Sequence, residues 1–183
     1  MLVVDHISKT FAKGTVNEHC AIKDLSITLK DGDFVTIVGS NGAGKSTLFN
    51  AICGSFLTDS GKILLDDMDI TFKSEHERAR VIGRVFQDPM KGTAPNMTIE
   101  ENLIAVRLDQ PPFTKGIMMN KSGQDAYAKE MVEQFDIRPA DYKLPTSSLS
   151  GGNAQKVVVA REVSLGNKLL VASQPTRGVD IGA

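Results

Sequence analysis

The sequence predicts an α/β fold that carries an antiparallel β piece and a helical insertion. Three observations lead to this prediction. A short apolar run over residues 34–38 is followed by a glycine-rich loop and then a helical pattern. Two segments of alternating apolar residues precede that run. Residues 90–148 differ in character and contain two helical patterns, the second of them amphipathic.

Composition limits the classes of function. The chain has 183 residues, 41% of them hydrophobic, which is enough for the core of one domain. A net charge of −1 provides no large basic field for nucleic acid or an anionic membrane. No apolar run approaches the ~18 residues that span a bilayer, so any membrane role is expected to act through a partner. Cys20 and Cys53 lie among apolar neighbours and are expected to be buried, reduced thiols.

Three strands are predicted before the glycine loop, with a polar, turn-like segment over residues 12–19 between the first two. Residues 2–11 and 21–29 alternate apolar and polar side chains, and Asp31–Gly32 makes a tight turn after them. Residues 34–38 are predicted to be a buried strand. Phe11, upstream of the glycine loop, either stacks on an adenine ring or fills the core at a strand end, and spacing alone does not separate these readings.

Residues 39–47 match the phosphate-loop pattern G-x-x-x-x-G-K-[ST] at each specified position. Over a chain of this length, a chance match has a probability of about one per cent or less. Glycines let successive N–H groups face one anion, and Ser46–Cys53 is predicted to be a helix that Gly54 ends. Lys45 is expected to meet the β- and γ-phosphates, and the Ser46 hydroxyl to bind Mg²⁺. The predicted phosphate-binding residues are Gly39, Ser40, Asn41, Gly42, Ala43, Gly44, Lys45, Ser46 and Thr47.

Shorter elements follow the loop and its helix. Residues 58–61 are predicted to turn, 62–66 to form a strand, 74–80 a helix opened by a capping box, and 81–86 another strand ending before Gln87. The charged side chains of the short helix are interpreted as a solvent-exposed face: Glu75, Glu77, Arg78 and Arg80.

The predicted insertion contains a helix over 100–107, opened by a second capping box at Thr98, and a helix over 122–135. The second helix is expected to bury one face, formed by Ala126, Met131, Val132 and Phe135. Met118–Met119 is interpreted as loop filling or core, with a soft protein-contact surface as the alternative.

A second anion-binding pattern follows the insertion. Ser150, Gly151 and Gly152 open a predicted helix, and bare N–H groups at a helix N-terminus attract anions. A flexible loop is the alternative interpretation. Residues 168–172 are predicted to be a buried strand, which ends in Ser173 and Gln174.

The segments GSNGAGKST, VFQDP, LSGGNAQK and LLVASQPTRGVD occur in this order. The chain therefore resembles an ABC-type ATPase, the ATP-binding subunit of an ABC transporter, over essentially its whole length. Residues 1–140 resemble single-domain ATPases of bacterial importers, and the last thirty-odd residues resemble ATPases of simple-sugar and nucleoside importers. The resemblance implies a P-loop NTPase core of ABC type, formed by residues 1–89 and 149–183, with 90–148 as the helical insertion.

The resemblance also implies roles. Two such subunits, identical or different, pair head to tail, so that Ser150, Gly151 and Gly152 meet the γ-phosphate of ATP on the partner. Gln87 senses Mg²⁺ and the attacking water, Phe11 stacks on adenine, and Asp180 lies at the dimer seam. The helical insertion docks on transmembrane permease subunits at the cytoplasmic face of the plasma membrane, and no nucleic acid is involved.

The chain departs from the family pattern at its catalytic carboxylates. Ser173 and Gln174 stand where the family has Asp and Glu. A serine brings no charge to Mg²⁺, and a glutamine orients water without accepting its proton, a loss of about 10²–10⁴-fold. The family's later switch histidine is also missing before Ala183, so a truncated domain is expected.

Three hypotheses follow from these observations. The first is an active transporter ATPase that uses Lys45, Gln87 and Gln174 around Mg-ATP. The second is a catalytically degenerate half-site that supports a partner ATPase. The third is an ABC ATPase of translation or DNA repair, a class that usually carries tandem domains or a coiled-coil insertion, neither of which this sequence contains.

Overall fold

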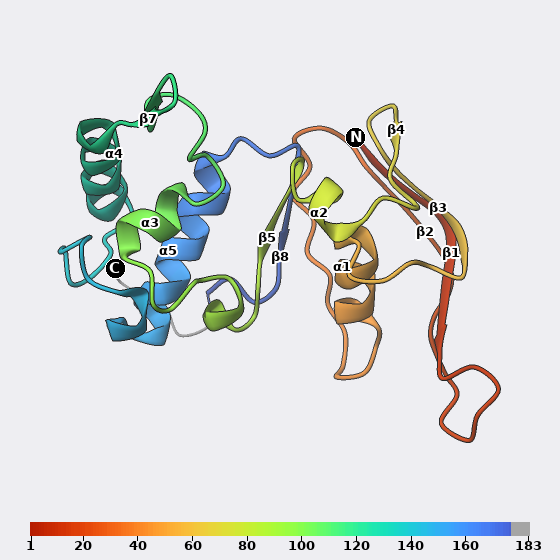
Figure 1. The fold of residues 1–183 in the computed structure, drawn as a ribbon. Helices are drawn as coiled ribbons and strands as arrows, with labels where there is room; N and C mark the ends of the chain where they lie inside the picture. Colours follow the sequence, from red (N-terminus) through yellow and green to blue (C-terminus); the bar gives the residue numbers. More distant parts are fainter. Residues whose placement is uncertain (177–183) are drawn as a thin grey trace. The chain divides into compact units, whose positions relative to one another are not determined.

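The computed structural model describes residues 1–176 and divides the chain into two compact units. The N-terminal unit is Met1–Ile82, and the C-terminal unit begins at Gly83. Figure 1 shows the elements of each unit.

The N-terminal unit contains an antiparallel sheet with strand order β2-β1-β3-β4. Its strands are β1 (Leu2–Phe11), β2 (His19–Leu29), β3 (Ser60–Leu65) and β4 (Met68–Asp69). Leu2 lies opposite Leu29 of β2 on one side and Leu65 of β3 on the other. The predicted antiparallel β piece is therefore confirmed, with β1 at its centre.

Two helices accompany this sheet, α1 (Lys45–Cys53) and α2 (Glu75–Arg78). The Ser74 side chain and the Glu77 side chain form the predicted capping box at the start of α2. Helix α1 contacts β2 and buries its apolar side chains. The buried apolar side chains of the unit are Leu2, Val4, Ile7, Ile22, Leu48, Ala51, Ile52, Cys53, Ile63, Leu65, Ile70 and Ile82.

The expectations for residues 34–38 and for Cys20 are wrong. Residues 34–38 form no strand, and Phe34 and Val38 are 95% and 86% exposed. An apolar β-branched run becomes a strand only where a neighbouring strand supplies its hydrogen bonds, and the four-stranded sheet of this unit does not include it. Cys20 is exposed on β2, whereas Cys53 is buried as expected. Alternation along a strand that is covered on one face leaves every second side chain in solvent.

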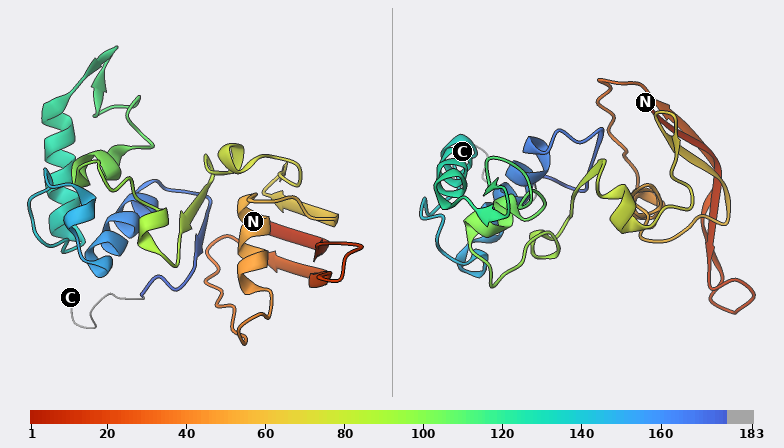
Figure 2. Two further views of the ribbon diagram at one scale, coloured as in Figure 1. Left: turned by 60° about the horizontal axis from the view of Figure 1, so that its bottom comes forward. Right: turned by 45° about the horizontal axis from the view of Figure 1, so that its top comes forward.

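The C-terminal unit joins a strand pair to a group of helices. Strand β5 (Ile82–Val85), which begins at the unit boundary, pairs with β8 (Leu169–Ala172). The helices are α3 (Ile99–Ile104), α4 (Lys121–Gln134) and α5 (Gly151–Ser164), with 3₁₀ turns η1 (Pro89–Lys91) and η2 (Thr146–Ser148). A hairpin of β6 (Thr114–Lys115) and β7 (Met118–Met119) precedes α4 (Figure 2).

Helix α3 packs against both α4 and α5, so one apolar cluster joins the insertion to the helix after Ser150. The capping box predicted at Thr98 is confirmed, with Glu101 as its partner. On α4, Met131 and Val132 are buried as expected, but the buried alanine is Ala128 and Ala126 is exposed. The cluster contains Ile99, Leu103, Ile104, Phe113, Ala128, Met131, Val132, Ile137, Val157 and Ala160.

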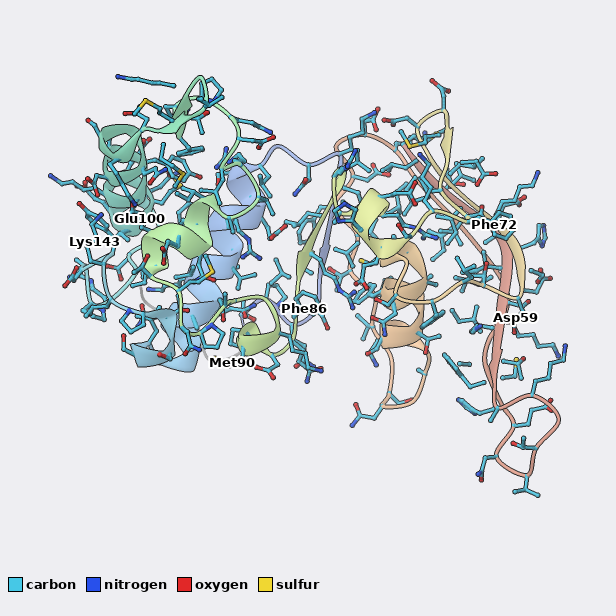
Figure 3. All side chains as sticks on the ribbon, viewed as in Figure 1. Asp59, Phe72, Phe86, Met90, Glu100 and Lys143 are labelled. Carbon is cyan, nitrogen blue, oxygen red and sulfur yellow. The ribbon has the colours of Figure 1, made fainter. Side chains whose placement is uncertain are left out.

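An ion cluster fixes the loop after α4. Lys143 Nζ donates to Glu100 Oε2 at 2.5 Å and to the Asp125 carboxylate, and Figure 3 shows Glu100 and Lys143 side by side. Glu100 is buried, so its charge needs this partner. The hydrogen bonds to Asp125 and then to Glu100 raise the pKa of Lys143.

Among the helices in the described part of the chain, none has the length and apolar composition needed to cross a membrane.

Candidate nucleotide-binding site

The phosphate loop leads directly into α1. Gly44 is the N-cap residue with φ of 85°, and Lys45 is the first helical residue. A side chain at Gly44 would bring Cβ within 2.6 Å of the Ala21 carbonyl oxygen of β2. Both the left-handed backbone and this close approach require glycine here. The second specified glycine of the motif is therefore explained by the geometry of the loop.

The Lys45 ammonium bends back over the loop. Its Nζ donates to the carbonyl oxygens of Gly39 and Ser40, both at 2.7 Å. The first turn of α1 contains no acidic residue, and no side chain caps its N–H groups. A lysine charge and an uncapped helix N-terminus thus point at one exposed loop, which is the arrangement that binds phosphate.

The opposite end of α1 is held by a residue whose role the sequence analysis missed. Arg78 of α2 is only 1% exposed, so its assignment to a solvent-exposed face is wrong. Its guanidinium donates to the carbonyl oxygens of Ala51 at 2.7 Å, Ile52 at 2.9 Å, Thr71 at 3.0 Å and Lys73 at 2.9 Å. A cation at a helix C-terminus satisfies the last carbonyl groups and favours the helix dipole. Burial lowers the pKa of this guanidinium.

Phe11, the predicted adenine-stacking residue, lies partly exposed at the end of β1. Its ring meets Phe56 edge to face with centroids 5.3 Å apart, and Lys9 Nζ lies 5.6 Å from its centroid. Lys9 also pairs with Asp59 at 3.0 Å. The hydrogen bond from the Thr10 N–H, followed by that from Lys9, lowers the pKa of Asp59. The ring is thus held in place with part of its surface open, and stacking stays a prediction.

In the C-terminal unit, Gln87 and Gln174 follow two paired strands. Gln87 is exposed two residues after β5 ends. The Ser173 N–H donates to the Val85 carbonyl oxygen at 2.9 Å, so Ser173 continues the pairing between β8 and β5. Gln174 is exposed and adopts φ of 51°, a conformation that few non-glycine residues take. Gln174 therefore has a strained backbone conformation.

The predicted second anion site is a helix N-terminus. Ser150 caps α5, and its Oγ accepts the Asn153 N–H at 3.4 Å. The first turn of α5 contains no acidic residue, and Gly151 is exposed. Ser150, Gly151 and Gly152 thus begin a regular helix rather than a flexible loop.

Two contacts that the motif did not reveal hold this helix. The Asn153 Oδ1 accepts the Arg138 N–H at 2.7 Å, and Lys156 Nζ reaches Asp136 Oδ2 at 3.2 Å. Hydrogen bonds from Arg138 and then Lys156 lower the pKa of Asp136. Neither spacing nor composition signals these partners, because they lie 15 and 20 residues apart in sequence.

The predicted site residues divide between the two units. Phe11 and residues 39–47 belong to the N-terminal unit, whereas Gln87, Ser150–Gly152 and Gln174 belong to the C-terminal unit. Within the first unit, the loop and α1 bring Lys45 onto Gly39 and Ser40. Asp180 lies outside the described residues.

The donors at the predicted metal positions test the fit to Mg²⁺, which is usually held by one or two carboxylates together with substrate phosphates. The predicted metal ligands Ser46 and Gln87 are uncharged, and so is Ser173, which stands where the family has Asp. Across residues 1–176, no group of three or more His, Cys, Asp or Glu side chains is arranged to hold a metal ion. None of Ser46, Gln87 and Ser173 brings the charge that a protein needs to hold Mg²⁺ by itself, so Mg²⁺ binding together with a triphosphate stays a prediction.

The fold, together with the N-termini of helices α1 and α5, defines a phosphate-loop nucleotide-binding domain. Residues 22–177 match the ABC transporter family. The chain belongs to this family, whose match covers most of its length.

Named relatives are ATP-binding proteins of transport systems, two of which are named as import proteins. The nucleoside import ATP-binding protein NupA of Lactococcus lactis subsp. cremoris is 37% identical over 164 residues, 88% of this chain and 32% of that protein. A tyrosine transport ATP-binding protein of Clostridioides difficile is 35% identical over 181 residues, 98% of this chain and 71% of that protein. A ribose import ATP-binding protein RbsA of Corynebacterium glutamicum is 33% identical, over 92% of this chain and 32% of that protein. The chain thus spans about a third of two of these relatives.

Solved structures agree on the fold. The dimeric ATP-binding cassette MJ0796, bound to ADP and Pi in a post-hydrolysis state, matches with a TM-score of 0.82 at 26% identity, over 98% of this chain and 76% of that one. The ADP conformation of MJ1267, an ATP-binding cassette of an ABC transporter, matches with a TM-score of 0.74 at 29% identity, over 98% and 70% of the two chains. The predicted α/β fold class, a P-loop NTPase core of ABC type, is confirmed.

Proposed function

We propose that the chain is the nucleotide-binding part of an ABC importer for a small solute, and that it binds ATP together with Mg²⁺. The observation that carries the proposal is the phosphate loop itself, in which Lys45 lies over Gly39 and Ser40 at an uncapped helix N-terminus. The names of two relatives, a nucleoside import and a ribose import ATP-binding protein, support import as the process. Those names differ in solute, so the solute class is left at small molecules.

Each predicted site residue receives a role in this proposal. Lys45 neutralises the β- and γ-phosphates, the Ser46 hydroxyl adds one oxygen to Mg²⁺, and Phe11 stacks on the adenine ring. Gln87 orients water near the metal, and Gln174 takes the water-polarising position. Gly151 and Gly152 offer main-chain N–H groups at the start of α5.

The proposed partners are a second ATP-binding subunit and permease subunits in the plasma membrane. Helix α5 is capped by Ser150 and has no acidic residue in its first turn, so its N-terminus attracts anions. The phosphate loop of the same chain does not need this second N-terminus to bind its own nucleotide. Head-to-tail pairing with a like or unlike subunit gives that end a γ-phosphate to bind. The chain would then lie at the cytoplasmic face of the membrane as a peripheral subunit.

A second candidate function is a degenerate half-site that binds ATP, hydrolyses it poorly, and supports a partner ATPase. Ser173 and Gln174 favour it, because neither side chain can accept the proton of an attacking water at neutral pH. In this version Lys45 and Ser150 keep their binding roles while Gln174 has no catalytic one.

Calorimetric titration with Mg-ATP tests the binding proposal. Lys45→Ala should weaken ATP binding by about 10- to 100-fold, because a charge-assisted contact to phosphate is lost. Lys62→Ala, at an exposed position of β3, is the matched control and should bind as the parent chain does. Failure of the parent chain to bind any adenine nucleotide would refute both versions.

A further inference from the structure

The β6–β7 hairpin displays an apolar tip. Ile117, Met118 and Met119 are 104%, 72% and 56% exposed. Gly116, with φ of 65°, and Ile117 form the turn between Lys115 and Met118, which lie opposite each other. Turns normally carry polar residues or glycine, so a fully exposed isoleucine at a turn tip is unfavourable for the isolated chain. Met118 and Met119 are therefore neither core nor loop filling.

The base of the hairpin is rigidly tied to α4. The Asn120 N–H donates to the Phe113 carbonyl oxygen at 2.9 Å, and the Asn120 side chain donates to the Pro112 carbonyl oxygen at 2.7 Å. The buried Gln124 side chain donates to the same Phe113 oxygen at 3.1 Å. Phe113 is itself buried and meets the Tyr127 ring edge to face at 5.0 Å. The tip is thus presented on a fixed support, projecting from the N-terminal end of α4 (Figures 1 and 2).

Within residues 110–122, which contain the hairpin, the charged side chains are positive, and Asp109 and Asp125 lie just outside this segment. Lys115 and Lys121 are exposed on either side of the tip, and residues 110–122 contain these two lysines and no acidic residue. The net charge of −1 gives the chain no large basic surface, so this attraction is local. An apolar protrusion flanked by lysines matches the chemistry of an anionic bilayer surface, where lysine stems extend toward the headgroups.

The size of the tip also favours lipid over a protein partner. Stable protein interfaces bury about 800 Å² on each side, with around 20–30 residues. Three protruding apolar residues fall far short of that, but they suit a soft surface that closes around them. Methionine side chains adapt to such a surface because they are unbranched and flexible.

We propose that the β6–β7 hairpin is a weak membrane anchor, whose Ile117, Met118 and Met119 enter the interface of a bilayer rich in anionic phospholipid while Lys115 and Lys121 contact the headgroups. This proposed membrane anchor is a function separate from ATP binding, and it does not depend on ATP binding. It also departs from the expectation that membrane contact occurs only through a partner protein. One short anchor of this kind gives reversible binding.

Vesicle sedimentation tests the charge requirement with the 183-residue chain. Protein-free vesicles of equal parts phosphatidylglycerol and phosphatidylcholine should bind the chain, and pure phosphatidylcholine should bind it much less. The double variant Lys115→Gln, Lys121→Gln should lose about 25-fold in partitioning, at about fivefold for each lysine. The control double variant Lys13→Gln, Lys62→Gln removes two exposed lysines from the N-terminal unit and should retain binding.

A tryptophan reporter tests insertion directly, since the chain contains no tryptophan. Ile117→Trp should shift its emission to the blue on addition of the anionic vesicles. Phe72→Trp, at another exposed position, is the control and should not shift. Thermal unfolding of each variant verifies that it is folded.

Three results would overturn the proposal. One is equal binding to both kinds of vesicle, and another is unchanged tryptophan emission of the Ile117→Trp variant on vesicles that bind the chain. The third is binding only to membranes that contain integral proteins, which would assign the hairpin to a protein partner. Each readout is independent of nucleotide, so loss of ATP binding in the Lys45→Ala variant leaves the expected vesicle results unchanged.

Discussion

The Arg78 guanidinium donates to the Ala51 carbonyl oxygen at 2.7 Å, at the opposite end of the helix that begins with Lys45. The same Nη1 also reaches the Ile52 carbonyl oxygen at 2.9 Å. The phosphate-binding helix is therefore fixed at both ends, by the tight Gly44 turn before it and by a buried cation after it. This relationship links a residue of α2 to the orientation of the loop without any contact to the loop itself.

Removing the guanidinium should destabilise the N-terminal unit. Arg78→Met keeps an unbranched apolar stem but leaves buried carbonyl groups without donors, which costs about 3 kcal/mol. A loss of this size lowers Tm by about 10 °C for a chain of this length. Arg80→Met, on the exposed side of the same segment, is the matched control and should leave Tm within about 1 °C. Equal Tm values for the two variants, measured by calorimetry, would contradict the assigned role.

The loop glycines should differ in their tolerance of a methyl group. Gly44→Ala combines the left-handed backbone penalty of about 1–2 kcal/mol with a collision against the Ala21 carbonyl oxygen. Gly42→Ala, at φ of 81° with no heavy atom within 4 Å of the added Cβ, meets the backbone penalty alone. Urea unfolding should therefore rank Gly44→Ala as clearly less stable than Gly42→Ala. The reverse order would show that the close approach to Ala21 is not maintained in solution.

Features of the fold that depend on neighbouring residues were predictable from the sequence, whereas features that depend on residues far apart in the chain were not. Both capping boxes, at Ser74 and at Thr98, were predictable because each is complete within four consecutive residues. The strand expected at residues 34–38 was wrong, because strand formation depends on partners distant in sequence. We expected Ala126 on the buried face of α4, but Ala128 is the buried alanine. Two alanines two positions apart do not define which face of the helix is buried.

The features of the candidate site likewise divide into those set by short motifs, which were predictable, and those set by residues distant in sequence, which were not. The turn geometry at Gly44 and the cap at Ser150 were accessible from short motifs. The burial of Arg78 was not, because its acceptors at Ala51 and Ile52 lie 27 and 26 residues away and no charge pattern announces them. The contact of Lys156 with Asp136 was missed for the same reason.

The pKa of His6 should lie above its usual 6.5, first because its Nδ1 shares a hydrogen bond with Asp24 Oδ1 at 2.6 Å and then because of the charge on Asp24. A raised folded-state pKa stabilises the fold fully below the unfolded pKa of about 6.5, and the stabilisation is lost as pH rises through the folded value. An NMR titration of the His6 ring should show a clear drop in pKa in Asp24→Asn. Asp5→Asn should have a smaller effect, because that carboxylate lies 3.9 Å from Nε2. Identical titration curves for the parent and Asp24→Asn would contradict the assignment.

Restoring the family's carboxylates should reveal whether Ser173 and Gln174 limit turnover. Gln174→Glu supplies a group that can accept the proton of the attacking water, and Ser173→Asp supplies a charge for Mg²⁺. If the rest of the site is intact, the double variant should release phosphate about 10²–10⁴-fold faster than the parent chain. Thr176→Glu adds a carboxylate two residues beyond Gln174, at an exposed position, and should give no gain. Adding Lys45→Ala to the double variant should abolish the gain, which distinguishes it from a contaminating phosphatase. Rapid phosphate release by the parent chain, lost in Lys45→Ala, would instead favour the active ATPase over the degenerate half-site.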